Sequence, residues 1–161
     1  MRRLAAALAI ILGLGACADP RAAENLRMAQ AFLTANAKTP GVVSLPSGLE
    51  YSVAHSGPPG GLSPRATDQV LVLYEGRLAS GQVFDSSYQR GKPDVMTVDR
   101  LIPAWTEALQ KMRPGDQWML YCPPNLAYGP KGVGPIPPNS LLIFKIELLQ
   151  VLPPDVSVGK G

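Results

Sequence analysis

Residues 69–78 read Gln-Val-Leu-Val-Leu-Tyr-Glu-Gly-Arg-Leu, and this stretch decides the class of fold. Its central apolar run is typical of a strand that contributes to a core. The next four residues, Ala-Ser-Gly-Gln (79–82), have the composition of a hairpin turn, and Val83 and Phe84 resume the strand pattern. The stretch therefore predicts an antiparallel β hairpin.

The flanking sequence extends this pattern to a sheet crossed by one helix. Further strands are predicted at residues 49–55, 95–98, 117–122 and 141–151, between loops rich in Gly and Pro. A helix is predicted over Pro103–Met112, because proline suits the first helical turn and the apolar residues at 105, 108, 109 and 112 share one face. An antiparallel sheet with a single helix across it is an α+β fold.

A second helix is predicted near the N-terminus, over residues 23–37. Its apolar residues recur at three- and four-residue steps and form one face: Leu26, Ala29, Phe32 and Leu33. A helix this short is marginal in water, so the face needs a partner. That partner is either the helix's own domain or a second copy of the chain, as in a homodimer.

The first sixteen residues have the features of a secretory signal. Arg2 and Arg3 precede an uncharged apolar run at 4–14, which is too short to span a bilayer. The run ends in Leu-Gly-Ala-Cys (14–17), which resembles a bacterial lipobox. That resemblance implies cleavage before Cys17 and lipid on its thiol, and Ala18 then favours the periplasmic side of the outer membrane of a bacterial cell envelope. An ordinary signal peptide followed by an unmodified cysteine is the alternative.

Composition excludes several classes of function. Without residues 1–16 the chain keeps 13 basic and 12 acidic residues, so its formal charge falls from +3 to +1, and no basic stripe for nucleic acid is visible. His55 is the only histidine, so neither a transition-metal site nor a base to activate Cys122 is expected. Cys122 lies in an apolar strand pattern and is predicted to be a buried thiol. No phosphate-binding or dinucleotide motif is present, and no cofactor is expected.

The aromatic residues suggest a pocket. Five of them fall on five separate predicted elements, each beside turn residues and with few polar groups near them: Tyr74, Phe84, Trp105, Tyr128 and Phe144. Taken singly, each is more simply explained as a core or turn residue. Taken together, they favour an apolar aromatic pocket.

Six short motifs in order give the chain a family resemblance between Ser47 and Leu152. They are Pro-Ser-Gly-Leu-Glu-Tyr (46–51), Tyr-Glu-Gly (74–76), Gly-Gln-Val-Phe-Asp-Ser-Ser-Tyr (81–88), Leu-Ile-Pro-Ala-Trp-Thr-Glu-Ala-Leu (101–109), Leu-Ala-Tyr-Gly (126–129) and Ile-Pro-Pro-Asn-Ser-Leu-Leu-Ile-Phe (136–144). In these motifs the chain resembles the FKBP-type peptidyl-prolyl cis-trans isomerases, including the secreted macrophage-infectivity-potentiator-like members. The resemblance implies a five- to six-stranded antiparallel half-barrel wrapped around the helix that carries Trp105.

The resemblance also implies an organisation along the chain. The isomerase domain would occupy residues 46–152, preceded by a tether and N-terminal helix at 17–45. Residues 153–161 would form a flexible tail.

The same resemblance assigns roles in a pocket. Trp105 would be the floor, with Tyr74, Phe84, Ile102, Tyr128 and Phe144 as walls and Leu101 and Ile136 at the rim. Asp85 would lie inside, held by Arg90. The Tyr128 hydroxyl and the Ile102 main-chain N–H would donate hydrogen bonds to the substrate. Two positions depart from the family pattern: Met96 stands for a pocket phenylalanine, and Ala104 for a glycine whose replacement would narrow the approach.

The activity implied is isomerisation of X–Pro bonds in unfolded or partly folded exported proteins, without metal, cofactor or covalent intermediate. A non-catalytic, chaperone-like module that grips proline-containing or apolar segments is the alternative.

Overall fold

The predicted hairpin is the centre of the sheet in the computed structural model, which describes residues 20–152. Strand β3 (Gln69–Leu78) turns into β4 (Val83–Ser86), and the two pair antiparallel. The turn is closed by the Leu78 N–H, which donates to the Gln82 carbonyl at 2.9 Å, and Gly81 adopts the positive φ of 90° that the turn requires. The hairpin prediction is confirmed.

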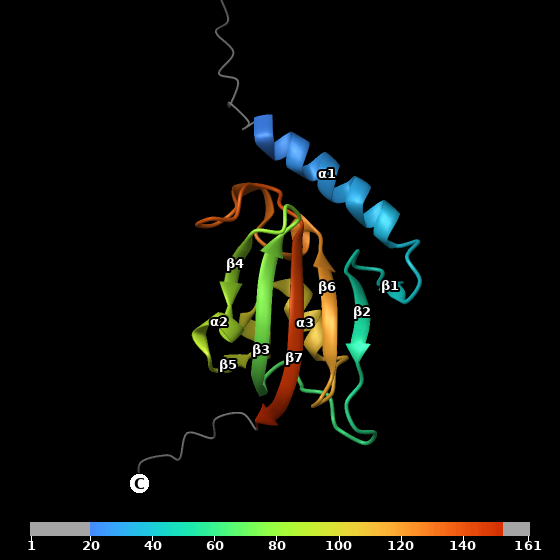
Figure 1. Cartoon of the computed structure of the whole chain (residues 1–161), viewed down its shortest axis with the longest axis vertical. Helices are drawn as coiled ribbons and strands as arrows, with labels where there is room; N and C mark the ends of the chain where they lie inside the picture. The colour runs from blue at the N-terminus through green and yellow to red at the C-terminus, as the bar shows by residue number, and fades with distance from the viewer. Residues whose placement is uncertain (1–19, 153–161) are drawn as a thin grey trace, which may run out of the picture.

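Seven antiparallel strands form one curved sheet in the order β1-β2-β6-β7-β3-β4, with β5 also on β3 (Figure 1). The remaining strands are β1 (Val42–Ser44), β2 (Glu50–His55), β5 (Asp94–Thr97), β6 (Gln117–Cys122) and β7 (Leu142–Leu152). The α+β architecture is confirmed. The sheet exceeds the expected five to six strands because β1, a three-residue segment, pairs with the edge of β2.

One edge of β3 is shared by two strands. β5 pairs with its first half, from Gln69 to Val72, and β4 pairs with its second half, from Glu75 to Arg77. Between them the backbone of Tyr74 has no strand partner on that side. The Ser87 hydroxyl takes this place: it accepts the Tyr74 N–H at 2.8 Å and donates to the Tyr74 carbonyl at 3.3 Å. Ser87 is fully buried, at the start of the short helix α2 (Ser87–Arg90).

The concave side of the sheet packs on helix α3 (Pro103–Leu109), with Pro103 in its first turn as predicted (Figure 1). The four residues of its predicted apolar face are all buried, and Ala108, Leu109 and Met112 are fully so. The helix ends at Leu109 rather than Met112, because the chain tightens into a turn in which the Met112 N–H shares the carbonyls of Ala108 and Leu109. Cys122 is also fully buried in this core, as predicted.

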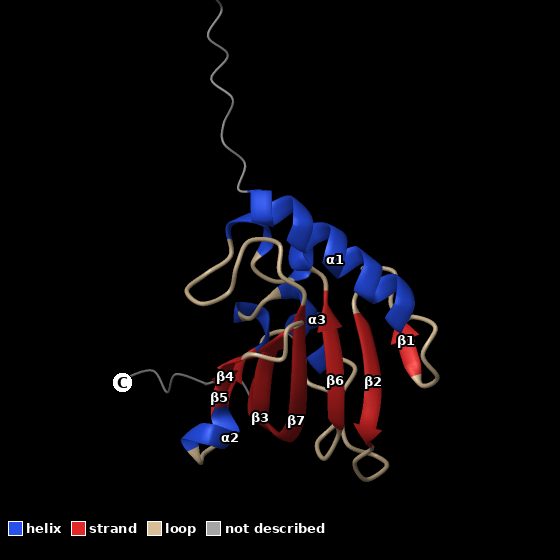
Figure 2. Ribbon diagram, turned by 45° about the horizontal axis from the view of Figure 1, so that its top comes forward, coloured by secondary structure: helices blue, strands red, loops and turns tan. Residues whose placement is uncertain are grey.

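Helix α1 (Pro20–Asn36) crosses the end of the sheet (Figures 1 and 2). It begins three residues earlier than predicted, since Pro20 is tolerated in a first helical turn. The helix packs on its own domain through Ala29, which is 2% exposed, and through Phe32, whose ring lies 6.0 Å from that of Tyr121. The predicted apolar face is only partly covered, because Leu26 remains 38% exposed. No helix within residues 20–152 is long and apolar enough to cross a membrane.

Candidate active site

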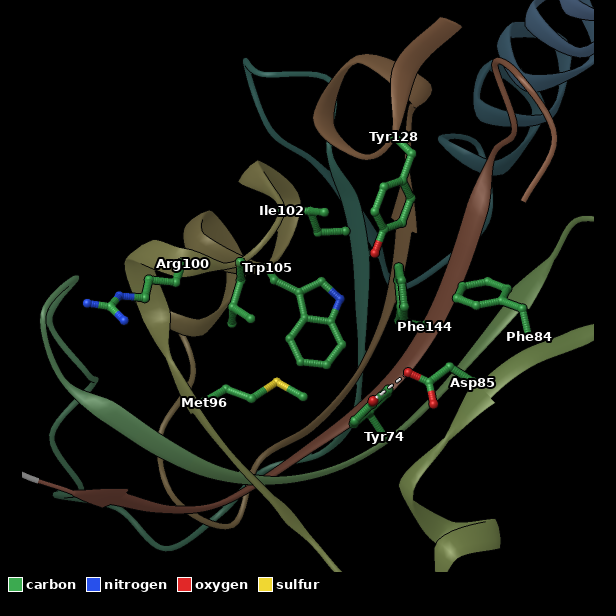
Figure 3. Close-up of a pocket in the computed structure, with 10 residues that line it drawn as sticks. Tyr74, Phe84, Asp85, Met96, Arg100, Ile102, Trp105, Tyr128 and Phe144 are labelled. Carbon is green, nitrogen blue, oxygen red and sulfur yellow. Dashed lines mark hydrogen bonds between the residues drawn. The ribbon is translucent and has the colours of Figure 1, made fainter. Parts of the chain in front are cut away.

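A pocket of about 430 Å³ opens on the concave side of the sheet, between β3, β4, β5, β7, α3 and the segment after β6 (Figure 3). It brings together residues separated by up to 70 positions along the chain. Its lining consists of Tyr74, Phe84, Asp85, Met96, Arg100, Leu101, Ile102, Trp105, Tyr128 and Phe144. All five aromatic residues singled out in the sequence therefore face one cavity.

The aromatic rings are packed edge to face. The indole of Trp105 lies 5.1 Å from the ring of Tyr74 and 5.3 Å from that of Phe144, with interplanar angles of 85° and 88°. Phe84 continues the series, 5.7 Å from Phe144 at 90°. Such T-shaped pairs are favourable beyond the area they bury, so each ring fixes the next. The pocket therefore has stiff, apolar walls.

Gly76 is the reason that two of these rings can meet. A Cβ placed on Gly76 would lie 2.6 Å from the Phe84 ring and 2.7 Å from the Phe144 ring, which is closer than atoms pack. Both rings therefore pass directly over the bare backbone of β3. The Tyr-Glu-Gly motif (74–76) carried this signal in the sequence, but the need for glycine appears only when the two phenylalanines are placed.

Asp85 is the one carboxylate in the lining, and its oxygens already have donors. The Tyr74 hydroxyl donates to Oδ2 at 2.6 Å, and Arg90 donates to Oδ1. Burial by itself raises the pKa of Asp85, but the bonds from Tyr74 and Arg90 outweigh it and hold the pKa below its usual range. Arg90 also pairs with Asp94, two residues before Met96. The network keeps Asp85 ionised and occupied, which is unlike a general base.

The Tyr74 phenol is correspondingly kept neutral. Burial, followed by its bond to the Asp85 carboxylate, raises the pKa of Tyr74 to about 12. The Arg90 guanidinium lies over the same ring, 5.5 Å from its centre. Tyr74 is thus both an apolar wall and the donor that orients Asp85.

Three donors in the pocket have no acceptor among residues 20–152, and one of them is the buried indole Nε1 of Trp105. The Tyr128 hydroxyl points from the rim toward the interior (Figure 3), and burial together with the nearby Asp85 charge raises the pKa of Tyr128. The main-chain N–H of Ile102 also lacks an acceptor in the described part of the chain. The Tyr128 hydroxyl and the Ile102 N–H are both free to donate to a carbonyl of a bound molecule.

Two residues, Ile136 and Ala104, lie elsewhere than the resemblance implied. Ile136 is 6% exposed and packs in the core beneath the loop that it shares with Val133, so it does not form the rim. Ala104 is fully buried in the same core, so its methyl group does not narrow the entrance. Arg90 holds Asp85 as implied, and it also donates to the Tyr74 hydroxyl, but it does not itself line the pocket. Leu101, Ile102 and Met96 do line the cavity.

Two contributors were missed in the sequence. Arg100 borders the pocket beside Met96, with its guanidinium turned outward (Figure 3). It is the last residue of a short 3₁₀ turn that no local sequence pattern indicated. Ser87, which holds the Tyr74 backbone, lies within the 81–88 motif, but that motif gave it no role. A serine directly after a strand that ends in Ser86 was the available signal.

The structure thus defines a class: an α+β half-barrel domain with an aromatic, largely apolar pocket closed by one helix. Comparison with known proteins extends this. The model of the FKBP-type peptidyl-prolyl cis-trans isomerase family matches residues 60–149, and that of a domain amino terminal to such isomerases matches residues 14–53. The chain belongs to the FKBP-type peptidyl-prolyl cis-trans isomerase family.

Individual relatives agree with this assignment. The peptidyl-prolyl cis-trans isomerase Mip of Coxiella burnetii is 50% identical over 128 residues, which cover 79% of this chain and 55% of that protein. The outer membrane protein MIP of Legionella longbeachae is 49% identical over 134 residues, which cover 83% of this chain and 57% of that protein. The crystal structure of FkpA from Escherichia coli superposes with a TM-score of 0.79 at 43% identity, covering 83% of this chain and 62% of that one. The Mip-like resemblance is confirmed, although the chain spans only a little over half the length of these relatives.

The Asp85 network predicts a pH-dependent contribution to stability. A carboxyl whose pKa is lower in the folded state stabilises the fold fully above its unfolded pKa of about 3.9, and loses that contribution as the pH falls through the folded-state value. In urea titrations at a series of pH values, wild type should therefore exceed Asp85→Asn in unfolding free energy near neutral pH. The gap should close below about pH 4. A gap that stays constant through the acid range contradicts the coupling.

Proposed function

We propose that this chain is a peptidyl-prolyl cis-trans isomerase acting on X–Pro bonds of unfolded or partly folded exported proteins. The observation that carries the proposal is the pocket itself: stiff aromatic walls, one carboxylate with its donors already in place, and two free donors at its edge. Family membership and the names of the relatives support the same activity.

Isomerisation of an X–Pro bond needs no nucleophile or acid–base group, because no covalent bond is broken. Rotation about a peptide bond is opposed by a barrier of about 18–20 kcal/mol, because resonance gives the C–N bond partial double-bond character. Resonance also places negative charge on the carbonyl oxygen, which water stabilises. An apolar pocket that excludes water stabilises that planar, dipolar form less, and so favours the twisted amide. A group that contacts the twisted form better than either planar form lowers the barrier further.

The residues take distinct parts in this scheme. The prolyl ring would rest on the Trp105 indole, between the walls formed by Tyr74, Phe84 and Phe144, with Met96 and Leu101 completing the apolar lining. The Tyr128 hydroxyl and the Ile102 N–H would donate to carbonyl oxygens on the two sides of the proline. Asp85 would supply a fixed negative charge beside the turning amide, oriented by Tyr74 and Arg90.

The assay that tests the proposal is acceleration of isomerisation in an X–Pro peptide, followed by NMR exchange or protease-coupled cleavage. Wild type should accelerate it. Tyr128→Phe should lower kcat/KM by about two- to tenfold, the value of one hydrogen bond. Asp85→Ala should lower it at least as much, because it also frees the Tyr74 hydroxyl.

The control is Tyr88→Phe, which removes a hydroxyl bonded to Glu147 and outside the pocket lining. It should leave kcat/KM unchanged. Binding of the peptide by wild type without any acceleration would replace the isomerase by the non-catalytic binding module.

We also propose that the protein works in the bacterial cell envelope, anchored by lipid on Cys17 to the outer membrane and facing the periplasm. The lipobox-like sequence supports this, and so does the name outer membrane protein MIP carried by one relative. Cys17 and residues 1–16 lie outside the described part of the chain.

Labelling of growing cells with radioactive palmitate tests the anchor. Wild type should incorporate the label, and Cys17→Ser should not, because the thiol is the acceptor of the lipid. Cys122→Ser serves as the matched control, since that thiol is fully buried and should leave labelling intact. Equal labelling of wild type and Cys17→Ser would remove the anchor.

A homodimer through α1 is the remaining proposal about partners. Leu26 and Met28 are 38% and 50% exposed on this helix, which leaves apolar surface for a second copy. Equilibrium sedimentation of the mature chain, with and without residues 18–40, should show a dimer only when these residues are present. A monomer at every concentration rules the dimer out.

A further inference from the structure

Helix α1 is attached to the loop that follows Tyr128 by two side-chain amides that reach in opposite directions. Asn25 of the helix donates to the main-chain carbonyl of Pro138 at 2.8 Å. Asn139 of the loop donates to the main-chain carbonyl of Ala22 at 3.0 Å. Ala29, one helical turn after Asn25, is nearly fully buried. We call this pair of hydrogen bonds the amide clamp.

The clamped loop, residues 129–139, is closed on itself. At its neck the Asn139 N–H donates to the Gly129 carbonyl at 2.8 Å. Nearer its tip Val133 and Ile136 exchange two main-chain hydrogen bonds, of 3.0 and 2.8 Å. Gly132 lets the two arms approach, since a Cβ there would lie 2.3 Å from the Ile136 carbonyl oxygen. These contacts tie the loop into one closed unit.

Tyr128 directly precedes this neck. Unlike Phe84 and Phe144, Tyr128 belongs to no strand, and its side chain remains 39% exposed at the pocket rim. Asn139 joins both sets of contacts: its N–H closes the neck and its side chain grips α1. It also holds a φ of 52°, a left-handed conformation that asparagine tolerates better than most residues. Figures 1 and 2 show the helix lying over this loop at the end of the sheet.

We infer that α1 is a positioning element of the pocket: through the amide clamp it fixes the 129–139 loop, and thereby the Tyr128 hydroxyl. Asn25 and Asn139 are then positioning residues, acting through Tyr128 without touching the substrate. This inference rests on the proposed isomerase function and adds a role for the N-terminal helix that needs neither a second copy nor a membrane.

The test compares full-length variants that keep the fold. Asn25→Ala removes one amide and introduces the best helix former, and Asn139→Gly removes the other while tolerating the positive φ. Thr34→Ala is the matched control, because the Thr34 hydroxyl bonds only within α1, to the Gln30 carbonyl. Hydrogen exchange of the amides of Val133 and Ile136 should be faster in both clamp variants, that of Asn139 should be faster in Asn25→Ala, and all three should be unchanged in the control.

Activity adds a second readout that depends on Tyr128. Asn25→Ala should lower kcat/KM by no more than the two- to tenfold loss expected of Tyr128→Phe, because Asn25 acts only through that hydroxyl. The same change in a Tyr128→Phe background should have little further effect, because the group being positioned is already gone. General loss of stability would instead lower activity equally in both backgrounds.

The outcomes separate the two proposals. If wild type does not accelerate isomerisation, the proposed function fails, while the exchange rates still decide whether the clamp fixes the loop. Unchanged exchange in both clamp variants overturns the inference. An activity loss of the same size with and without the Tyr128 hydroxyl also overturns it, since the helix would then act by another route.

Discussion

The hydrogen bonds between the Ser87 hydroxyl and the backbone of Tyr74 hold together the point at which the sheet changes partners. Buried main-chain groups must be paired, and β3 changes there from β5 to β4 on one edge. By filling the gap with a side chain, the protein keeps β3 continuous while two short strands diverge from it. The pocket wall forms where these two strands diverge, and there the Tyr74 hydroxyl donates to the Asp85 carboxylate.

The polar and aromatic groups that line the pocket are mostly paired with one another. The carboxylate of Asp85 is held by Tyr74 and Arg90, and the rings of Trp105 and Phe144 fix one another edge to face. What remains open is a largely apolar surface with two donors at its margin. Such a site suits a reaction limited by bond rotation, because it changes the environment of an amide and leaves its atoms unattacked.

Local patterns were sufficient for elements that local chemistry determines. The β3–β4 hairpin follows from its turn, and α3 follows from Pro103 and a regular apolar face. Local patterns were insufficient where the structure of a segment depends on contacts with distant segments. The sharing of β3 by two strands depends on its length and on Ser87, and the burial of Ile136 depends on how its loop folds under itself. Arg100 was missed because a surface cation carries no sign of which cavity it borders.

The fixed polar network has a consequence for the conditions under which the pocket keeps its shape and charge. Tyr74 has a pKa of about 12, that of Tyr128 is raised and that of Asp85 is lowered, so none of these groups changes its charge between roughly pH 5 and 9. No histidine lies in the lining. The charges of the pocket are therefore independent of pH over that range, which would suit the proposed isomerase to a compartment that does not regulate its own pH.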